Sequence, residues 1–282
     1  MSTLCYDLHS HSTASDGTLA PRDLVERAAR SGVHVLALTD HDTTAGLAEA
    51  EQAAGPLGLE VVRGVEVSVT WGGRTVHILG LNVARDCVAL EDGLARLRVE
   101  REGRARRIAA LLEEAGIPGA YEGARALAKG SILSRTHFAH FLVAEGVAES
   151  VRDVFKKYLI NGKPGHVSGE WAGLAEAVGW IRAAGGQAVI AHPARYGFTA
   201  AKLGRLVAEF QEAGGRGLEV VSGSHAPEDN DRMATVARRH GLLASSGSDF
   251  HGPENPWREL GAMPRLPADL RPVWADWGGQ AA

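Results

Sequence analysis

The sequence predicts an α/β fold in which a parallel sheet, covered by helices, is arranged as a barrel. Short runs rich in Val, Ile and Leu alternate with segments whose apolar residues recur at helical spacing. Strands of this composition are typical of parallel sheets that are buried on both faces. The number of strand–helix units favours a barrel over an open sheet, so functional side chains are expected at the carboxyl ends of the strands.

The expected elements are separated by glycine, proline and polar residues, which mark turns. The strands are expected at residues 4–8, 33–42, 59–69, 74–83, 187–193, 216–223 and 242–251. The helices are expected at 21–32, 45–58, 173–186, 201–215 and 227–241. Pro21 and Gly32 illustrate the signals used, because proline favours a helix start and glycine a helix end.

The middle of the chain differs, because no strand is evident from about Val88 to Gly165. Residues 90–116 form one long, charged helical segment, and shorter helices follow at 134–146 and 151–159. We therefore predict a barrel made of residues 1–87 and 166–282, with a helical insertion at 88–165. The tail from residue 253, rich in Pro and Trp, should pack across the barrel as irregular chain.

The composition is that of an ordinary globular protein and excludes several functions. The chain has 282 residues, of which 45% are hydrophobic, and its formal net charge is -4. This charge gives no overall attraction to nucleic acid, so double-stranded DNA is not an expected partner. Neither a membrane span nor a signal peptide is evident. Cys5 and Cys87 lack the spacing of a zinc site or a disulfide framework, so we expect a cytoplasmic protein.

Two histidines in the segment LHSHSTASDG, His9 and His11, end the first expected strand. Side chains two residues apart on a strand point to the same side, as a pair of metal ligands must. Such a pair also occurs at solvated or core positions, so this motif alone does not establish a metal site.

The other expected strands repeat the pattern at their carboxyl ends or in the turns beyond. The residues there are Asp40, His41, Glu66, His77, His192, Asp249 and His251. Histidines scattered through a core would not recur at one edge of the sheet, so we predict a metal centre. Imidazole and carboxylate groups bind divalent zinc, manganese or iron. Glu66 is the candidate bridge between ions, since a carboxylate has two oxygens, and Asp16 can reach a neighbouring ion.

These motifs resemble the PHP family (polymerase and histidinol phosphatase) over nearly the whole chain. The matching segments are HSHSTASDG, TDHD, GVEVS, HILG, AHPARY and SGSDFH. The resemblance implies a distorted (β/α)7 barrel with up to three metal ions at its rim. The implied ligands are His9, His11, Glu66 and Asp249 for the first ion, Asp16, His41 and His251 for the second, and Glu66, His77 and His192 for the third.

The position of Asp16 bears on the identity of the metal. Relatives known for trinuclear zinc sites carry histidine there, and aspartate is a harder and more anionic ligand. We therefore expect two to three divalent ions, with manganese as the first candidate and zinc, iron and magnesium as alternatives.

The insertion resembles that of stand-alone bacterial PHP enzymes that act on nucleoside 3′,5′-bisphosphates and on the 5′ ends of short RNA. The matching segments are SRTHFAHFLV and VFKKYLINGKPGHV, with AHPARY and SGSHAP in the barrel. The resemblance implies a phosphomonoesterase that removes the 3′-phosphate of a small nucleotide by attack of a hydroxide generated at the metals. A monomer is a separate expectation, because the sequence does not give the oligomeric state. Action as a 5′-to-3′ exoribonuclease on short RNA is a further expectation.

Residues with candidate catalytic roles are Asp16, His41, His251 and His137. The leaving oxygen would take its proton from His251, from His137 or from a water. The sequence does not choose among these three donors.

Substrate binding is expected from the insertion and from the segment after His192. Arg135 and His137 would anchor a phosphate, with Ser134, Thr136 and Arg195 assisting, because guanidinium binds phosphate through two parallel hydrogen bonds. The alternative is that Ser134 caps a helix whose face is solvated.

The remaining charged residues are given less specific roles. The basic run from Arg96 to Arg107 and the lysines near residue 160 are expected to form solvated surface. Asp40 and Asp42 are expected to support the ligands or to form the turn, and orienting His41 is one such supporting role.

Two other functions remain open at this point. One is a phosphatase for another small metabolite, such as histidinol phosphate. The other is a non-catalytic metal-binding module, as some PHP domains fused to polymerases are. Degenerate domains tend to lose ligands, whereas all nine ligand positions are filled here, which favours an enzyme.

Overall fold

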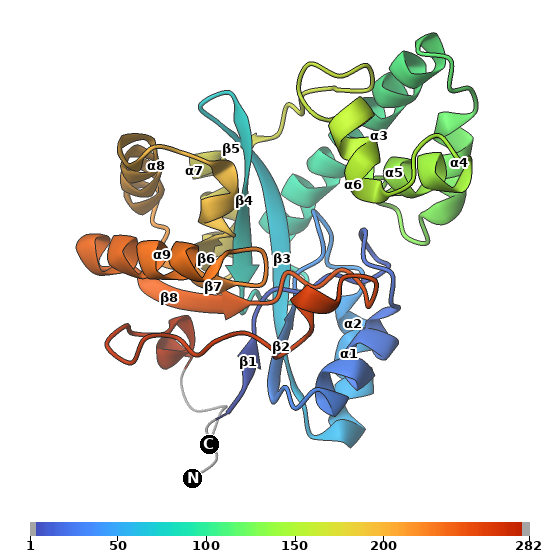
Figure 1. Cartoon of the computed structure of the whole chain (residues 1–282). Coiled ribbons are helices and arrows are strands. Elements are labelled where there is room, and N and C mark those ends of the chain that lie inside the picture. The colour runs from blue at the N-terminus through green and yellow to red at the C-terminus, as the bar shows by residue number, and fades with distance from the viewer. Residues whose placement is uncertain (1–3, 278–282) are drawn as a thin grey trace.

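The strands form one sheet that curves into a nearly closed barrel, which confirms the predicted fold class (Figure 1). The computed structural model describes residues 4–277. In this part of the chain the sheet order is β1-β2-β3-β4-β6-β7-β8, and β5 pairs with β3 outside this path. The strands are β1 Tyr6–Asp7, β2 Val35–Leu38, β3 Glu60–Trp71, β4 Arg74–Leu81, β5 Ala172–Gly173, β6 Gln187–Ile190, β7 Gly217–Ser222 and β8 Leu243–Gly247.

The barrel closes where the chain beyond β1 meets the chain beyond β8. The backbone N–H of His11 donates to the carbonyl of Phe250 at 2.9 Å, and that of Asp249 donates to the carbonyl of His9 at 2.9 Å. These bonds join two segments from opposite ends of the chain. Barrel closure therefore brings the histidine pair beside Asp249.

Strand β4 is antiparallel to both β3 and β6, which corrects the expectation of a parallel sheet. Strands β3 and β4 form a long hairpin whose turn contains Gly72 and Gly73, with φ of 54° and 72°. Two residues with positive φ suit a tight hairpin turn. A parallel arrangement of β3 and β4 would need a much longer crossover connection between them. Because β4 runs backwards, His77 near its start pairs with Ser68 near the end of β3.

Helices cover the outside of the barrel with their apolar faces. They are α1 Pro21–Arg30, α2 Leu47–Ala54, α7 Leu174–Ala183, α8 Ala200–Glu212 and α9 Pro227–His240. The C-terminal segment packs across the barrel as predicted, because Val273 joins a cluster of strand residues and the Trp274 ring stacks on Tyr6 with centroids 4.0 Å apart. No helix within residues 4–277 is long and apolar enough to cross a membrane.

Between β4 and β5 the chain forms helices from Val88 to Leu159, and this helical lobe leaves the barrel after β4 (Figure 1). It contains α3 Val88–Glu114, α4 Ala120–Leu127, α5 Arg135–Ala144, α6 Val151–Val154 and a π-helical turn at Phe155–Leu159. Leu112, Phe138 and Leu142 belong to its own apolar core. Helix α4 was not expected from the sequence, because Gly119 and Gly123 interrupt its helical pattern.

Arg101, in the middle of α3, is only 7% exposed, which corrects the expectation that the basic run is a solvated face. Its Nε donates to Oδ2 of Asp42 at 2.5 Å, and its Nη2 donates to Oγ of Ser68 at 2.8 Å. The other Asp42 oxygen accepts the backbone N–H of Ser68 at 2.7 Å. Asp42 follows β2 and Ser68 lies in β3, so this buried ion pair fixes the lobe to the barrel.

Replacing Arg101 with Met should lower the free energy of unfolding by about 3 kcal/mol, because the buried Asp42 carboxylate loses its cation. Urea denaturation followed by circular dichroism measures this change. The control is Arg96→Met, because the Arg96–Glu176 pair is exposed at 2.8 Å and its loss should cost less than about 1 kcal/mol. Equal losses in the two variants would contradict a structural role for the buried pair.

Candidate metal centre and active site

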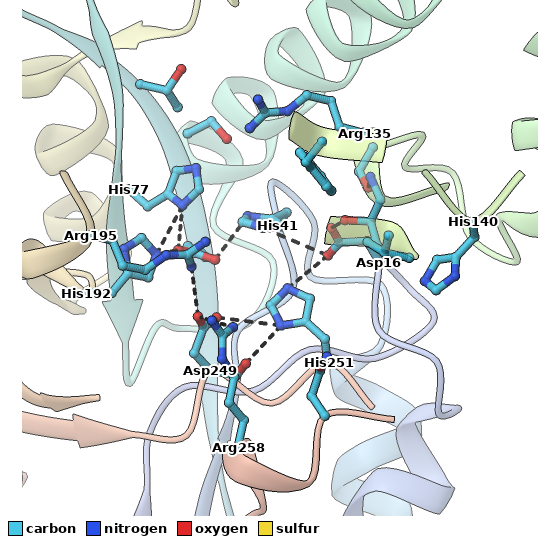
Figure 2. Close-up of a pocket in the computed structure, with 18 of the residues that line it drawn as sticks. Asp16, His41, His77, Arg135, His140, His192, Arg195, Asp249, His251 and Arg258 are labelled. Carbon is cyan, nitrogen blue, oxygen red and sulfur yellow. Dashed lines mark hydrogen bonds and ion pairs between the residues drawn. The ribbon is translucent and has the colours of Figure 1, made fainter. Parts of the chain in front are cut away.

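The nine residues predicted as metal ligands lie together at one rim of the barrel, and Figure 2 labels six of them. Their ligand atoms form four overlapping groups, and within each group the atoms lie within 4.8 Å of one another. The groups are His11, Asp16, His41 and His251; His9, Glu66 and His192; His9, His11 and Asp249; and His41, Glu66 and His77.

The histidine pair faces two carboxylates. The Nε2 atoms of His9 and His11 are 3.1 Å apart, and they lie 3.3 Å and 3.2 Å from Oε2 of Glu66. Oδ1 of Asp249 is 3.6 Å from Nε2 of His9 and 3.7 Å from Nε2 of His11. Four ligand atoms therefore face a common point, as in the first implied ion site.

Asp16 organises a second group on the side of the helical lobe. Its Oδ1 lies 3.5 Å from Nε2 of His251 and 3.9 Å from Nε2 of His41. Its Oδ2 accepts a hydrogen bond from Oγ1 of Thr136 at 3.1 Å. One Asp16 oxygen thus faces the imidazoles while the other is held by the lobe.

Glu66 lies between the groups and directs its two oxygens to different histidines. Oε1 lies 2.8 Å from Nδ1 of His77 and 3.0 Å from Nε2 of His192, whereas Oε2 lies 3.0 Å from Nδ1 of His41. This arrangement suits the bridging role that the sequence suggested for Glu66.

The unsatisfied polar atoms of the rim fit divalent cations. Within the described residues, Oδ1 of Asp16, Oε2 of Glu66 and Nδ1 of His41 are buried and make no contact with hydrogen-bond geometry, although their nearest polar neighbours lie 3.0–3.5 Å away. Buried carboxylate oxygens without a donor are costly, and a cation would satisfy them. The set contains imidazole nitrogen and carboxylate oxygen without thiolate, which suits manganese, zinc or iron rather than a soft metal such as copper(I).

The pKa shifts at the rim differ among the proposed ligands. Burial disfavours the charged forms of His9 and His11, but neighbouring carboxylates, Glu66 among them, raise the pKa of both rings, so a cation bound there would displace a proton.

Other rim groups are held in forms whose lone pairs are free. Burial disfavours the charged form of Glu66, yet His41 and His77 outweigh it and hold its pKa well below the usual value. Burial lowers the pKa of His41 well below its ordinary value and that of His192 to about 4. Anionic carboxylate and neutral imidazole are the forms that bind metal ions.

Glu219 supports two of the proposed ligands and was missed by the sequence analysis. It is fully buried in β7, where its Oε1 lies 3.0 Å from Nδ1 of His9 and its Oε2 accepts the backbone N–H of His192 at 2.5 Å. A carboxylate on the far nitrogen of a ligand histidine fixes the ring orientation and tautomer. The available signal was a single acidic residue inside the apolar strand GLEVVS.

Asp249 is held by two arginines on the oxygen that faces away from the histidine pair. Oδ2 of Asp249 accepts hydrogen bonds from Nη1 of Arg195 at 2.9 Å and from Nη1 of Arg258 at 3.1 Å. Burial raises the cost of this charge, but His9 and Arg195 keep the pKa of Asp249 well below its usual value. Arg195, predicted to touch substrate, therefore also positions a proposed ligand.

Asp40 supports the loop that carries Asp16 rather than orienting His41. Its oxygens accept hydrogen bonds from the backbone N–H and Oγ of Ser12, at 2.8 Å and 2.7 Å, and from Oγ of Ser15 at 2.6 Å. These bonds fold the loop that carries Asp16. Asp40 therefore fixes the position of Asp16, and no bond to His41 is found among the described residues.

A cavity of about 650 Å³ opens over the rim, between the barrel and the helical lobe. Arginines from both parts line it: Arg101, Arg104, Arg135, Arg152, Arg195 and Arg258. Arg135 and Arg258 lie on opposite sides of the labelled ligands (Figure 2). The cavity therefore combines a candidate metal centre with positive charge from two directions.

The lobe arginines carry positive charge that other lobe residues do not neutralise. Burial lowers the pKa of Arg104 to about 9, with Arg135 and Arg101 adding repulsion, and burial likewise lowers the pKa of Arg135. Within the described residues, neither Arg104 nor Arg135 has a carboxylate at ion-pair distance. Mutually repelling guanidiniums around a cavity favour the binding of an anion there.

Of the predicted substrate residues in the lobe, Ser134, Arg135 and Thr136 line the cavity. Ser134 also caps α5, because its Oγ accepts the backbone N–H of Thr136 at 3.1 Å. His137 is buried, its Nδ1 accepts the backbone N–H of Ser134 at 3.1 Å, and it is not among the lining residues. His140, one helical turn after Thr136, lines the cavity instead and was not predicted.

Comparison with known proteins gives consistent relatives over the whole chain. The 3′,5′-nucleoside bisphosphate phosphatase of Chromobacterium violaceum is 51% identical over 271 residues, which cover 96% of this chain and 95% of the relative. The 5′-3′ exoribonuclease Rnm of Escherichia coli is 47% identical over 274 residues, covering 96% and 93%. A structure from Chromobacterium violaceum, described as an amidohydrolase with bound sulfate and no metal, is 50% identical with a TM-score of 0.93, covering 96% and 95%.

The cluster of imidazole and carboxylate groups at the carboxyl rim defines the class as barrel proteins with side chains placed to bind metal. The model of the PHP domain matches residues 7–160 of this chain. The chain belongs to the PHP family.

Replacing Glu219 with Gln should weaken metal binding about 10- to 100-fold while leaving every proposed ligand in place, because His9 loses its orienting carboxylate. Elemental analysis after dialysis against buffered manganese measures the change. The control is Glu60→Gln, at the far end of β3 from the rim. If the Glu219→Gln protein retains as much metal as the wild type at every concentration, Glu219 does not support the centre.

Proposed function

We propose that the protein is a metal-dependent phosphomonoesterase that removes the 3′-phosphate of nucleoside 3′,5′-bisphosphates. The observation that carries this proposal is the cavity, which places the nine-residue cluster opposite a patch of unneutralised lobe arginines. A substrate with two phosphates would use both features. The name of the relative that is 51% identical supports this choice.

The lobe arginines are the proposed site for the phosphate that does not react. Arg104 and Arg135 would bind the 5′-phosphate, with guanidinium hydrogen bonds that fix its orientation. This would hold the 3′-phosphate at the rim. Histidinol phosphate has one phosphate and would leave the arginine patch unused, so the geometry favours the bisphosphate.

The rim residues are the proposed catalytic site. Bound divalent cations would supply Lewis acidity and an activated water at neutral pH. Three ligand sets are proposed. The first is His9, His11, Glu66 and Asp249; the second is Asp16, His41 and His251; and the third is Glu66, His77 and His192. Manganese is the first candidate, and zinc, iron and magnesium are the alternatives.

The structure bears on the source of the proton for the leaving 3′-oxygen. Nε2 of His251 faces Asp16, and its Nδ1 lies 2.9 Å from the carbonyl of Asp249, so both ring nitrogens are engaged. His137 is buried and is not among the residues that line the cavity, and its Nδ1 accepts the backbone N–H of Ser134. We therefore favour a water as the proton donor. The oxygen of the attacking water bonds to phosphorus, and the bond from phosphorus to the 3′-oxygen breaks. The 3′-oxygen then takes a proton from the donor water.

The same bond is broken when a 5′-phosphorylated RNA loses its first nucleotide. In RNA the phosphate on the 3′-oxygen also carries the next nucleoside, and the relative named as an exoribonuclease supports this second activity. The cavity suits a nucleotide or a single strand rather than a duplex. We further propose that the protein is a monomer and that it acts in the cytoplasm, and the unpaired Cys5 and Cys87 agree with a reducing compartment.

Replacing Asp249 with Asn should remove bound metal and lower phosphate release from adenosine 3′,5′-bisphosphate by about 100-fold or more, because a ligand and a negative charge are lost together. Elemental analysis and a phosphate-release assay with manganese measure both effects. Asp269→Asn is the control, since Asp269 is exposed and pairs with Arg238. Retained turnover with reduced metal content would exclude Asp249 from the catalytic centre.

Replacing Arg135 with Ala should raise KM for adenosine 3′,5′-bisphosphate about 10- to 100-fold with unchanged metal content, because a charge-assisted phosphate contact is lost. Steady-state kinetics measures KM, and histidinol phosphate serves as a substrate with one phosphate. Arg107→Ala is the control, because Arg107 is exposed on α3 and does not line the cavity. An unchanged KM would remove the lobe from substrate recognition.

A further inference from the structure

Trp257 is an exposed aromatic side chain at the candidate active site. Seven large apolar side chains are exposed in the described residues, and Trp257, at 78%, is the most exposed of them. It is also the only one of the seven that lines the cavity. An exposed aromatic ring at the edge of a binding site is a surface on which a ligand can stack.

The chain around Trp257 is tied to the proposed catalytic residues. The segment follows β8 and comes directly after Asp249 and His251 in the sequence. The next residue, Arg258, donates from Nη1 to Oδ2 of Asp249 at 3.1 Å. This bond anchors the backbone beside Trp257 to the rim, while the indole itself remains open to solvent.

The arrangement of charges gives a direction to a bound strand. Arg135 and Arg258 lie on opposite sides of the labelled ligands (Figure 2). If Arg104 and Arg135 hold the 5′-phosphate and the rim holds the phosphate on the 3′-oxygen, the chain of a longer substrate continues on the side of Arg258. Trp257 directly precedes Arg258 in the sequence and lines the same cavity.

We propose that Trp257 is a stacking platform for the base of the second nucleotide of a 5′-phosphorylated RNA. This inference rests on the proposed function. A bisphosphate has no second nucleoside, whereas in RNA one is esterified to the reacting phosphate. Stacking on an indole accepts any base, because every base has a π face. Trp257 thus sets the preference for an oligonucleotide over a bisphosphate and adds little base specificity.

The test compares two substrates in matched variants. The substrates are adenosine 3′,5′-bisphosphate and the 5′-phosphorylated dinucleotide of adenosine, and kcat/KM is measured for each with manganese. In Trp257→Ala the ratio of kcat/KM for the dinucleotide over that for the bisphosphate should fall about tenfold. Trp257→Phe should keep most of the ratio. Val99→Ala is the control, because Val99 is an apolar side chain that is 71% exposed and does not line the cavity.

A dinucleotide whose second nucleoside lacks its base provides an independent check. With this substrate the wild type and Trp257→Ala should have the same kcat/KM, because there is no base to stack. An unchanged ratio in Trp257→Ala, or equal losses with the base present and absent, would overturn the proposal.

The stacking role of Trp257 can be tested even if the proposed hydrolytic function is wrong. If the wild type hydrolyses neither substrate, the proposed reaction is wrong, and calorimetric binding of the dinucleotide without added metal then decides the role of Trp257. About tenfold weaker binding in Trp257→Ala than in the wild type would support the stacking site. Equal binding in the two proteins would overturn it.

Discussion

The carboxylate of Glu66 is the group on which the rest of the site depends. It is completely buried, and ring nitrogens of five histidines lie 2.8–3.3 Å from its oxygens: His9, His11, His41, His77 and His192. A buried anion is tolerated only where positive charge or donors surround it. These histidines come from several strands, so only the closed barrel provides that environment.

The scaffold supports this arrangement at some conformational cost. Asp42, His192 and Asp249 have φ of 51°, 29° and 54°, in the left-handed region that residues other than glycine rarely adopt. All three follow strand ends at the rim, where they redirect the chain. The Asp42–Arg101 ion pair and the Arg195 and Arg258 bonds to Asp249 hold these positions. Within the described residues, the other two non-glycine residues with positive φ, Asn82 and Asp86, follow β4 away from the rim, so three of the five lie where the chain turns at the proposed metal centre.

The sequence alone predicted the barrel class and the identity of the clustered rim residues, because both follow from local patterns. Strand ends are marked by the change from apolar to polar residues, as at His41 and Asp249. The direction of β4, the burial of Arg101 and the contact of Glu219 with His9 could not be predicted in the same way. Each depends on which distant segments meet in space, and a single charged residue in a helix or strand does not reveal its partner.

The most direct test of the account is anomalous diffraction from crystals grown with manganese. The account predicts two or three manganese peaks at the rim, with Glu66 in contact with more than one of them and ring nitrogens completing each shell. Peaks elsewhere on the molecule, or a rim that stays free of metal at saturating manganese, would contradict the claim that these nine side chains form one cation-binding centre.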